Sequence, residues 1–220
     1  MSFVHVAVFL LVLSWTPGLV SWASAEGYVA GHLGISLPDN WADVNATSLN
    51  AMGITPGARM SDLDLQNSLV YGAKLGYFTA TRPWLGVEVE AYTSTPHISQ
   101  QTVIAAVPGS ATGGTLLGSH LRITTVAFNI MTRDTTYGDF QPYGGVGPAL
   151  FITQSSGGVI TETHAKLGLN IEAGGRYFLS KRFALFGEFK YNKVDSVKAD
   201  GLRGDYSTQI FLGGVSFHFY

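Results

Sequence analysis

The chain has 220 residues, of which 13% are charged, and its formal net charge is −2. Typical globular proteins carry about 25% charged residues, so the composition argues against an ordinary soluble domain, and the charge gives no indication of nucleic-acid binding. The 27 Gly are also abundant, and the absence of Cys excludes disulfides and cysteine chemistry.

The N-terminal segment 1–25 predicts a cleaved secretory signal peptide. Residues 3–13 form an apolar core, and Ala23-Ser-Ala25 has the small-x-small form that signal peptidase cleaves. Cleavage after Ala25 would leave 26–220 as one mature domain. The alternative is an uncleaved N-terminal anchor, but the apolar core is short for a spanning helix, which needs about 20 apolar residues.

The rest of the chain alternates apolar residues with polar or small ones at a period of two, which is typical of β-strands. Eight such segments, each about ten residues long, follow one another. Their ranges are 28–37, 68–78, 84–93, 120–131, 142–151, 164–178, 183–193 and 206–220. Long connections, among them 38–67 and 94–119, alternate with short ones. Outer-membrane barrels alternate long extracellular loops and short periplasmic turns in the same way.

Each predicted strand has one apolar face and one face that holds its charges. In 84–93, Leu85, Val87 and Val89 alternate with Glu88 and Glu90. A charge on a lipid-facing position at the bilayer midplane costs about 2–4 kcal/mol, so the apolar faces are expected to contact lipid. The pattern therefore predicts an all-β fold, an eight-stranded antiparallel up-and-down transmembrane β-barrel.

The inward faces predict an internal network of ion pairs. Its expected members are four acids and four bases: Lys74, Glu88, Glu90, Lys166, Glu172, Arg176, Glu188 and Lys190. An eight-stranded barrel is just wide enough for its side chains to fill, and unpaired buried ions cost several kcal/mol. We therefore expect a plugged lumen rather than an open porin-like channel. Catalysis by Glu88 and Glu90 is the sharper alternative, but any polar strand face gives their spacing.

Aromatic residues toward the strand ends predict the two girdles that barrels place at the headgroup level of the membrane. The candidates are Tyr28, Tyr71, Tyr77, Trp84, Tyr92, Tyr143, Tyr177, Phe183, Tyr191 and Tyr206. Pro148 falls within a predicted strand, where it has no N–H to donate, and it predicts a β-bulge.

The last predicted strand carries the most specific motif. Gly214, Phe217 and Phe219 lie in a sequence that resembles the C-terminal strand of bacterial outer-membrane barrels, except that Tyr220 follows the closing Phe. Three further segments resemble the superfamily that includes the transmembrane domain of outer-membrane protein A; they are 141–147, 170–180 and 185–191.

This resemblance implies an integral protein of the outer membrane of a Gram-negative-type bacterium. Its implied partners are outer-membrane lipid, lipopolysaccharide and, during insertion, the barrel-assembly machinery, which would recognise Gly214, Phe217, Phe219 and Tyr220. A monomer is the favoured oligomeric state. The motifs identify a fold and not an activity.

The expected function is a structural or surface-contact role in which the loops 38–67 and 94–119 face outward, because function on a barrel resides in such loops. The apolar run 102–107 in the second loop is compatible with a hairpin above the membrane, with a partner contact or with a packed loop. One alternative is the passage of small hydrophobic molecules through a lateral opening. A soluble lipocalin-type barrel would instead place its apolar side chains inward.

A lipid A-modifying barrel enzyme is the less favoured alternative. Ser119-His120 and Thr163-His164 fall near predicted loop–strand junctions, but they match no motif of such enzymes. The six His show no metal-ligand spacing. The sequence therefore predicts no catalytic, cofactor-binding or metal-binding residues.

Overall fold

The computed structural model describes most of the chain after the N-terminal segment. The described residues are 25–39, 42–46, 59–60, 65–98, 101–107, 110–116, 119–156, 163–199 and 202–220. The expected signal peptide, with Ala23, lies outside them. No helix in these residues is long and apolar enough to cross a membrane.

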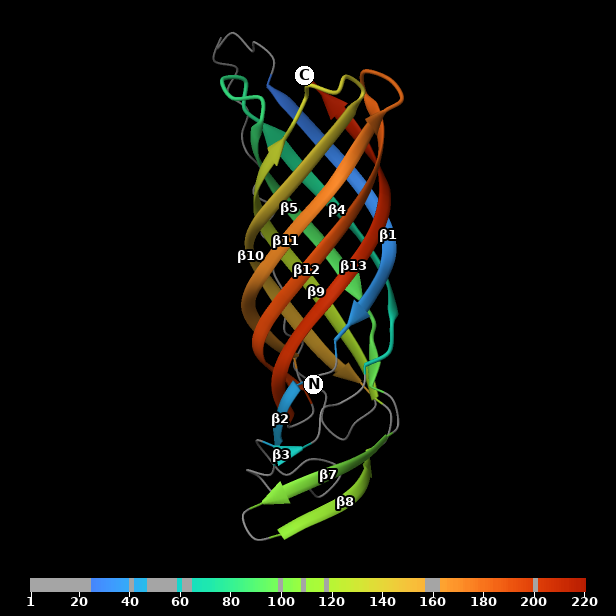
Figure 1. Cartoon of the computed structure of the whole chain (residues 1–220), viewed down its shortest axis with the longest axis vertical. Helices are drawn as coiled ribbons and strands as arrows, with labels where there is room; N and C mark the ends of the chain where they lie inside the picture. Colours follow the sequence, from blue (N-terminus) through green and yellow to red (C-terminus); the bar gives the residue numbers. More distant parts are fainter. Residues whose placement is uncertain are drawn as a thin grey trace, which may run out of the picture.

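Eight long antiparallel strands form a closed barrel, which confirms the predicted fold (Figure 1). In chain order they are β1 (Glu26–Pro38), β4 (Ser68–Phe78), β5 (Leu85–Ser94), β9 (Ser119–Arg133), β10 (Phe140–Ser156), β11 (Thr163–Phe178), β12 (Phe183–Ala199) and β13 (Leu202–Phe219). Each strand pairs with the next one, so the topology is up-and-down.

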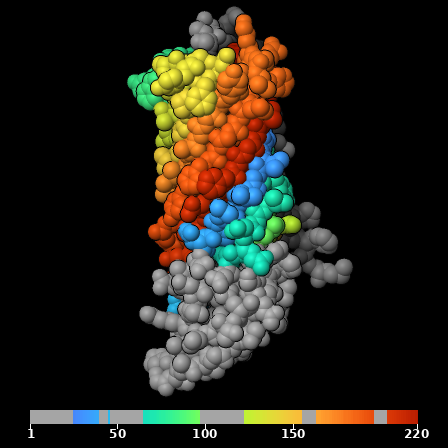
Figure 2. Space-filling view, turned by 45° about the vertical axis from the view of Figure 1, so that its right-hand side comes forward, coloured from blue at the N-terminus to red at the C-terminus, as the bar shows by residue number. Residues whose placement is uncertain are grey.

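The barrel closes where β13 pairs with β1. Their ladder runs without interruption from Gly27–Phe219 to Pro38–Thr208. In the space-filling view, red β13 crosses the surface diagonally between orange β12 and blue β1 (Figure 2). The ring of Phe219 covers Gly27 so closely that a Cβ on Gly27 would lie 2.2 Å from it. Glycine here therefore allows the terminal aromatic ring to pack on the seam.

The strands continue past the barrel at the end opposite the C-terminus. There β2 (Ala42–Ala46), β3 (Arg59–Met60), β7 (Gln101–Val107) and β8 (Ser110–Leu116) extend the sheet outward from β13, while β6 (His97–Ile98) pairs with β9. The antiparallel ladder between β7 and β8 confirms the hairpin expected at 102–107. Figure 1 shows this hairpin below the barrel.

Short turns close the other end, as the alternating connection lengths predict. The turn after β9 is held locally: the backbone N–H and the hydroxyl of Thr136 donate to Asp134 Oδ1 over 2.9 and 2.7 Å. These bonds lower the pKa of the Asp134 carboxyl below its ordinary value. Gly138 follows with φ 67°, a left-handed conformation that Gly adopts without steric cost. Outer-membrane barrels place such turns in the periplasm.

The outer face is apolar along the middle of the strands. Leu33, Leu69 and Leu167 are 69%, 68% and 70% exposed, and Val87 and Ile130 are exposed on neighbouring strands. Soluble monomers rarely expose apolar patches larger than a few hundred Å². Hydrocarbon is therefore the medium that suits this surface.

The aromatic girdle prediction is wrong for several tyrosines. Trp84, Tyr71, Tyr77, Tyr177 and Phe183 do point outward, but others are buried inside the barrel. These are Tyr28, Tyr92, Tyr143 and Tyr206, at 1%, 3%, 7% and 3% exposure. They lie on the inward parity of their strands, where their rings and hydroxyls fill the interior.

Inward glycines make room for these large side chains. A Cβ on Gly76 would lie 2.2 Å from the Tyr28 ring, and one on Gly174 would lie 2.8 Å from the Tyr143 ring. Since a narrow barrel cannot hold a side chain at every inward position, small residues beside large ones let the interior fill. This packing accounts for part of the high Gly content.

The bulge predicted at Pro148 is wrong. The pairing of β10 with β11 runs through Pro148, and β10 and β9 keep one register from Val146–Ile130 to Ala149–Ala127. Only the pairs of Gly147 and Pro148 with β9 are missing from that ladder. Because Pro lacks an N–H, the strand loses ladder pairing without gaining a residue.

We predict that Val89→Arg, on the outward face of β5, lowers the free energy of unfolding in a bilayer by about 2–4 kcal/mol. The reason is that the new charge would lie in hydrocarbon. Denaturant unfolding in lipid vesicles, followed by heat-modifiable gel mobility, would measure the change.

The matched control is Thr132→Arg, an outward position at the periplasmic end of β9 that pairs with Leu85. It should cost about 0–1 kcal/mol, because side chains near the interface reach water. Equal costs for the two variants would contradict the assignment of this face to lipid.

Candidate functional site

A chain of buried ion pairs crosses the middle of the barrel. Lys74 Nζ lies 3.3 Å from Glu88 Oε2 and 2.5 Å from Glu188 Oε2. Lys190 Nζ lies 2.7 Å from both Glu188 Oε1 and Glu90 Oε2, and it also contacts Glu172. These residues come from β4, β5, β11 and β12, so the network ties together opposite walls of the barrel. We call these six residues the central network: Lys74, Glu88, Glu90, Glu172, Glu188 and Lys190.

The central network is dry in the sense that its side chains have almost no contact with solvent. Lys190 is 0% exposed, and Lys74, Glu88, Glu90 and Glu172 are 1–2% exposed. Opposite charges must lie close together in such a place, because desolvating each ion costs several kcal/mol that only pairing and hydrogen bonds offset.

Neutral polar groups on the same level complete the network. The Tyr28 hydroxyl donates to Glu88 Oε2 over 2.5 Å, and the Tyr143 hydroxyl donates to Glu188 Oε2 over 2.6 Å. Asn170 Nδ2 donates to Asn129 Oδ1 over 3.0 Å. Tyr28 and Tyr143 therefore act as hydrogen-bond donors to two of the buried carboxylates.

A second polar layer lies at the periplasmic end. Glu26 Oε2 accepts a hydrogen bond from Arg133 Nη1 over 2.5 Å, and Glu26 Oε1 lies 2.6 Å from His218 Nδ1. His218 Nε2 lies 2.8 Å from Ser216 Oγ. These contacts join the first and last strands of the barrel to β9, and we call the four residues the rim layer.

Serine, histidine and glutamate occur here in the order of an acyl-transfer triad, so the geometry raises the question of hydrolysis. Ser216 and His218 are, however, 1% and 0% exposed. A carbonyl substrate cannot reach Ser216 Oγ in this conformation, because attack requires contact at about 3 Å. The chemistry that this arrangement supports is the closing of the barrel end by hydrogen bonds.

Arg176 stands between the two layers. Its guanidinium carbon lies 4.4 Å from the centre of the Tyr28 ring and 5.2 Å from that of Tyr143, and its Nη1 is 3.9 Å from Glu26 Oε1. Stacking on aromatic faces is a favourable environment for a guanidinium that lacks water.

Toward the extracellular end the interior changes character. Val70, Phe151 and Ile210 are each 1% exposed, and Ser36 Oγ lies 2.8 Å from Thr208 Oγ1. The buried lysines, arginines and carboxylates of the described interior are thus confined to its middle and its periplasmic end.

Of the eight predicted network residues, the structure brings six together in the central network and places Arg176 beside it. Lys166 is different: it pairs in the ladder with the inward Phe151, yet its side chain is exposed. The alternation along a strand predicts which face Lys166 lies on, but not how far along the barrel axis it lies. Lys166 lies beyond the part of the barrel whose interior is filled.

The internal network predicted from the sequence did not include Glu26, Arg133, His32 or His218. The first predicted strand began at residue 28, so Glu26 fell before it. The predicted strand 120–131 ended before Arg133, which therefore fell in the following turn. The signal was present, because Glu26 shares the parity of Tyr28, and Arg133 shares that of Asn129. Extending the alternation by one period at each end would have found both.

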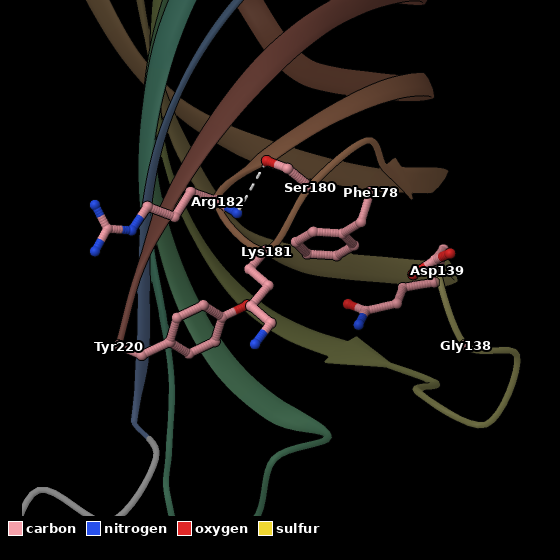
Figure 3. A pocket seen from close by; sticks show the side chains of 8 residues that line it. Gly138, Asp139, Phe178, Ser180, Lys181, Arg182 and Tyr220 are labelled. Atoms are coloured by element: carbon pink, nitrogen blue, oxygen red, sulfur yellow. Dashed lines mark hydrogen bonds between the residues drawn. The ribbon is translucent and has the colours of Figure 1, made fainter.

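A pocket of about 490 Å³ opens at the periplasmic rim (Figure 3). Lys181 and Arg182 from the turn after β11 lie there with Asp139 from the turn after β9, and Tyr220 and Phe178 form its apolar wall. The basic side chains are exposed, and an acid accompanies them. The pocket therefore has no strong preference for anions.

The model of the outer membrane protein beta-barrel domain family matches residues 6–219. The chain belongs to this family. Membership places it in the outer membrane of a Gram-negative cell, as predicted. No curated protein matches the chain in sequence.

Solved structures with the same fold come from three bacterial groups. The outer membrane protein OprG from Pseudomonas aeruginosa has a TM-score of 0.60 and 15% identity, covering 90% of this chain and 97% of its own. Neisserial surface protein A has a TM-score of 0.55 and 13% identity, covering 88% and 97%. Ail, the attachment invasion locus protein of Yersinia pestis, solved with the heparin analogue sucrose octasulfate, has a TM-score of 0.50 and 14% identity, covering 89% and 99%. Identities this low support the fold alone.

We predict that Lys190→Met lowers the free energy of unfolding by about 3–5 kcal/mol, because it leaves buried carboxylates without their cation. Lys166→Met, on the next strand, should change it by no more than about 0.5 kcal/mol, since its side chain is exposed.

Denaturant unfolding of both variants in lipid vesicles, with folded protein scored by heat-modifiable mobility, would make the comparison. A small loss for Lys190→Met, equal to that of Lys166→Met, would show that the network contributes little to stability.

Proposed function

We propose that the protein is a non-enzymatic outer-membrane barrel with a closed interior and a structural or surface-contact role. The observation that carries the proposal is the central network, in which six ionic side chains meet across the barrel at 5% exposure or less. Moving an ion past this point would require breaking several buried pairs at once, which is costly in a medium of low dielectric constant.

The surface role is assigned to the extracellular extension, where β2, β3, β7 and β8 carry the sheet beyond the membrane. The loop 94–119 that contains the hairpin has no Asp, Glu, Lys or Arg. Its side chains offer hydroxyl and small apolar groups, so contact with the uncharged sugars of lipopolysaccharide or with another neutral surface is the chemistry that fits.

A sulfated polysaccharide fits less well. Ail was solved with the heparin analogue sucrose octasulfate. In this chain the loop 38–67 contains Asp39, Asp43, Asp62 and Asp64 against a single Arg59. Like charges repel sulfate groups, so the loop composition favours a partner that is not polyanionic.

The C-terminal strand is the part of the barrel that we relate to its assembly into the membrane. We propose that Gly214, Phe217, Phe219 and Tyr220 form the signal that the barrel-assembly machinery recognises, and that the protein acts as a monomer in contact with lipid and lipopolysaccharide. Phe219 and Tyr220 are 52% and 67% exposed, so both rings are accessible on the outer side of the seam.

A second candidate is the passage of small hydrophobic molecules through the wall. Two observations favour it: the β9–β10 ladder lacks pairs at Gly147 and Pro148, and the extracellular half of the interior is uncharged. The backbones still touch there, since a Cβ on Gly147 would lie 1.8 Å from the Phe128 carbonyl oxygen, so β9 and β10 would have to separate to let an apolar solute leave.

The test is to reconstitute the barrel into planar bilayers and into vesicles. The closed interior predicts no large steady ion current at moderate voltage, whereas Lys190→Met should raise the frequency of openings because it removes the central cation. A large steady current from the wild-type barrel would exclude the plugged interior.

The same vesicles separate the two candidates. Faster entry of an apolar fluorescent solute than into protein-free vesicles, abolished when Val146→Cys is cross-linked to Ile130→Cys beside the missing pairs, would favour the transport candidate. Equal entry rates would favour the structural role.

A further inference from the structure

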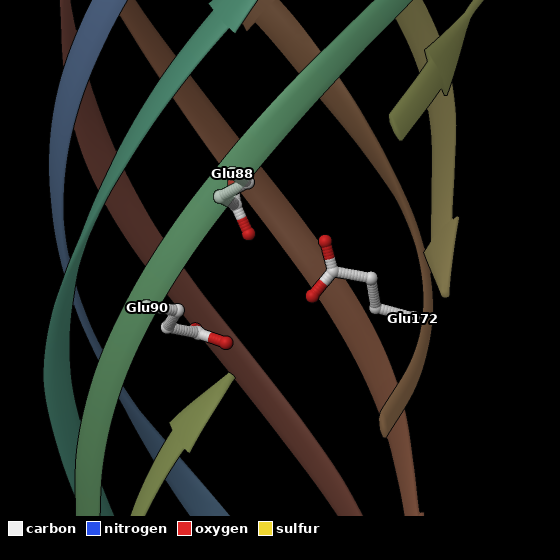
Figure 4. A group of neighbouring side chains, drawn as sticks. All are labelled: Glu88, Glu90 and Glu172. Carbon is white, nitrogen blue, oxygen red and sulfur yellow. The ribbon is translucent and has the colours of Figure 1, made fainter. Parts of the chain in front are cut away.

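Three carboxylates of the central network converge on one point in the interior. Glu88 and Glu90 extend from β5, and Glu172 reaches toward them from β11 (Figure 4). One carboxylate oxygen from each lies within 4.8 Å of the other two. Convergence of three acids in a place with no solvent is unfavourable unless cations balance them.

The protein supplies too few cations for this purpose. The central network contains four carboxylates, those of Glu88, Glu90, Glu172 and Glu188, and only two ammonium groups, those of Lys74 and Lys190. Two negative charges therefore remain without a counter-charge on this level. A single divalent cation would supply the missing charge.

The hydrogen bonds leave one oxygen of each of the three acids without a partner. Lys190 contacts the Oε2 atoms of Glu90 and Glu172, and Tyr28 donates to Oε2 of Glu88. The Oε1 atoms of these three glutamates are buried and accept no hydrogen bond from the described residues. Each acid thus has one oxygen held by the protein and one oxygen available to a ligand.

A buried histidine gives independent support. The side chain of His32, from β1, is 0% exposed, and within the described part of the chain neither ring nitrogen has a hydrogen-bond partner. Its Nε2 lies 3.6 Å from Glu90 Oε1, which is too far for a hydrogen bond. An unpartnered imidazole in a filled interior costs free energy, so a group between these two atoms is expected.

The spacing of the two atoms suits a metal ion. Zinc binds imidazole nitrogen and carboxylate oxygen at about 2.0–2.2 Å, which places two ligands of a tetrahedral ion about 3.4 Å apart. The three glutamate oxygens lie within 4.8 Å of one another, so they would have to draw together by up to about 1.4 Å to reach this spacing around one tetrahedral ion. Mixed carboxylate and imidazole ligands favour Zn²⁺ or Mn²⁺ over Ca²⁺, which takes oxygen ligands.

We propose that Glu88, Glu90 and Glu172 form an internal binding site for one divalent metal ion, Zn²⁺ or Mn²⁺, and that His32, which lies beside Glu90, moves toward the other two acids to complete it. The ion would enter while the barrel folds and would then be enclosed by it. The ion would have a structural role, because it would join β1, β5 and β11 through the interior. The site does not depend on the surface role of the loops.

The test measures the metal content of folded barrels. Wild-type protein is refolded from urea into detergent with Zn²⁺, Mn²⁺, Ca²⁺ or Mg²⁺ added singly, washed with EDTA, and assayed by inductively coupled plasma mass spectrometry. Heat-modifiable mobility confirms folding. We expect about one Zn²⁺ or Mn²⁺ per chain to survive the wash, because the site is buried. A folded wild-type barrel that retains none of the four ions would overturn the proposal.

Matched variants locate the ion. Glu88→Gln and His32→Gln should fold with less than a tenth of the wild-type metal content, whereas Glu26→Gln, which changes a buried carboxylate of the rim layer, should retain it. Retention by both of the first two variants would also overturn the proposal. If they fail to fold, X-ray absorption of the loaded wild-type barrel decides: one imidazole with oxygen neighbours supports the site, and a shell without imidazole refutes it.

Discussion

The structure depends on the pairing of charges inside a closed barrel from which water is excluded. Lys190 contacts three carboxylates and Lys74 contacts two. Two of these contacts, Lys74 with Glu188 and Lys190 with Glu90, reach across the interior to join strands that do not pair. The wall supplies main-chain pairing between neighbours only. The buried ions therefore stabilise a particular cross-section, and Tyr28 and Tyr143 donate hydrogen bonds to two of the carboxylates.

The same constraint explains the distribution of small and large residues. A narrow interior that contains Tyr28, Tyr143 and long ionic side chains has no volume left for side chains at Gly76 or Gly174. On the outside the requirement is reversed, since lipid accepts Leu33 or Leu167 at high exposure without cost. Each strand therefore has one face suited to lipid and one face suited to the packed interior, and these two requirements produce the alternation in the sequence.

Alternation made the barrel predictable from sequence. It gave the bounds of β4 to the residue and placed Glu88 and Glu90 inside. It could not give height along the axis, so Lys166 was grouped with the network although it lies beyond the closed part. It did not identify β8, whose Gly, Ala and Thr residues show no apolar alternation, and this strand is recognised only by its pairing with β7. The choice of pairs, such as Lys190 with Glu172 or Glu26 with His218, needs three-dimensional neighbours that no strand pattern contains.

The seam between β1 and β13 has a consequence for how the protein is made. The hydrogen bond between Glu26 and His218 joins residues 192 positions apart, and the β1–β13 ladder connects the earliest and latest strands of the barrel. Until the last strand leaves the ribosome, β1 has one unsatisfied edge, and the apolar outer surface has no lipid to contact. Topologies dominated by such distant contacts fold slowly. The cylinder therefore cannot close until β13 is available to pair with β1.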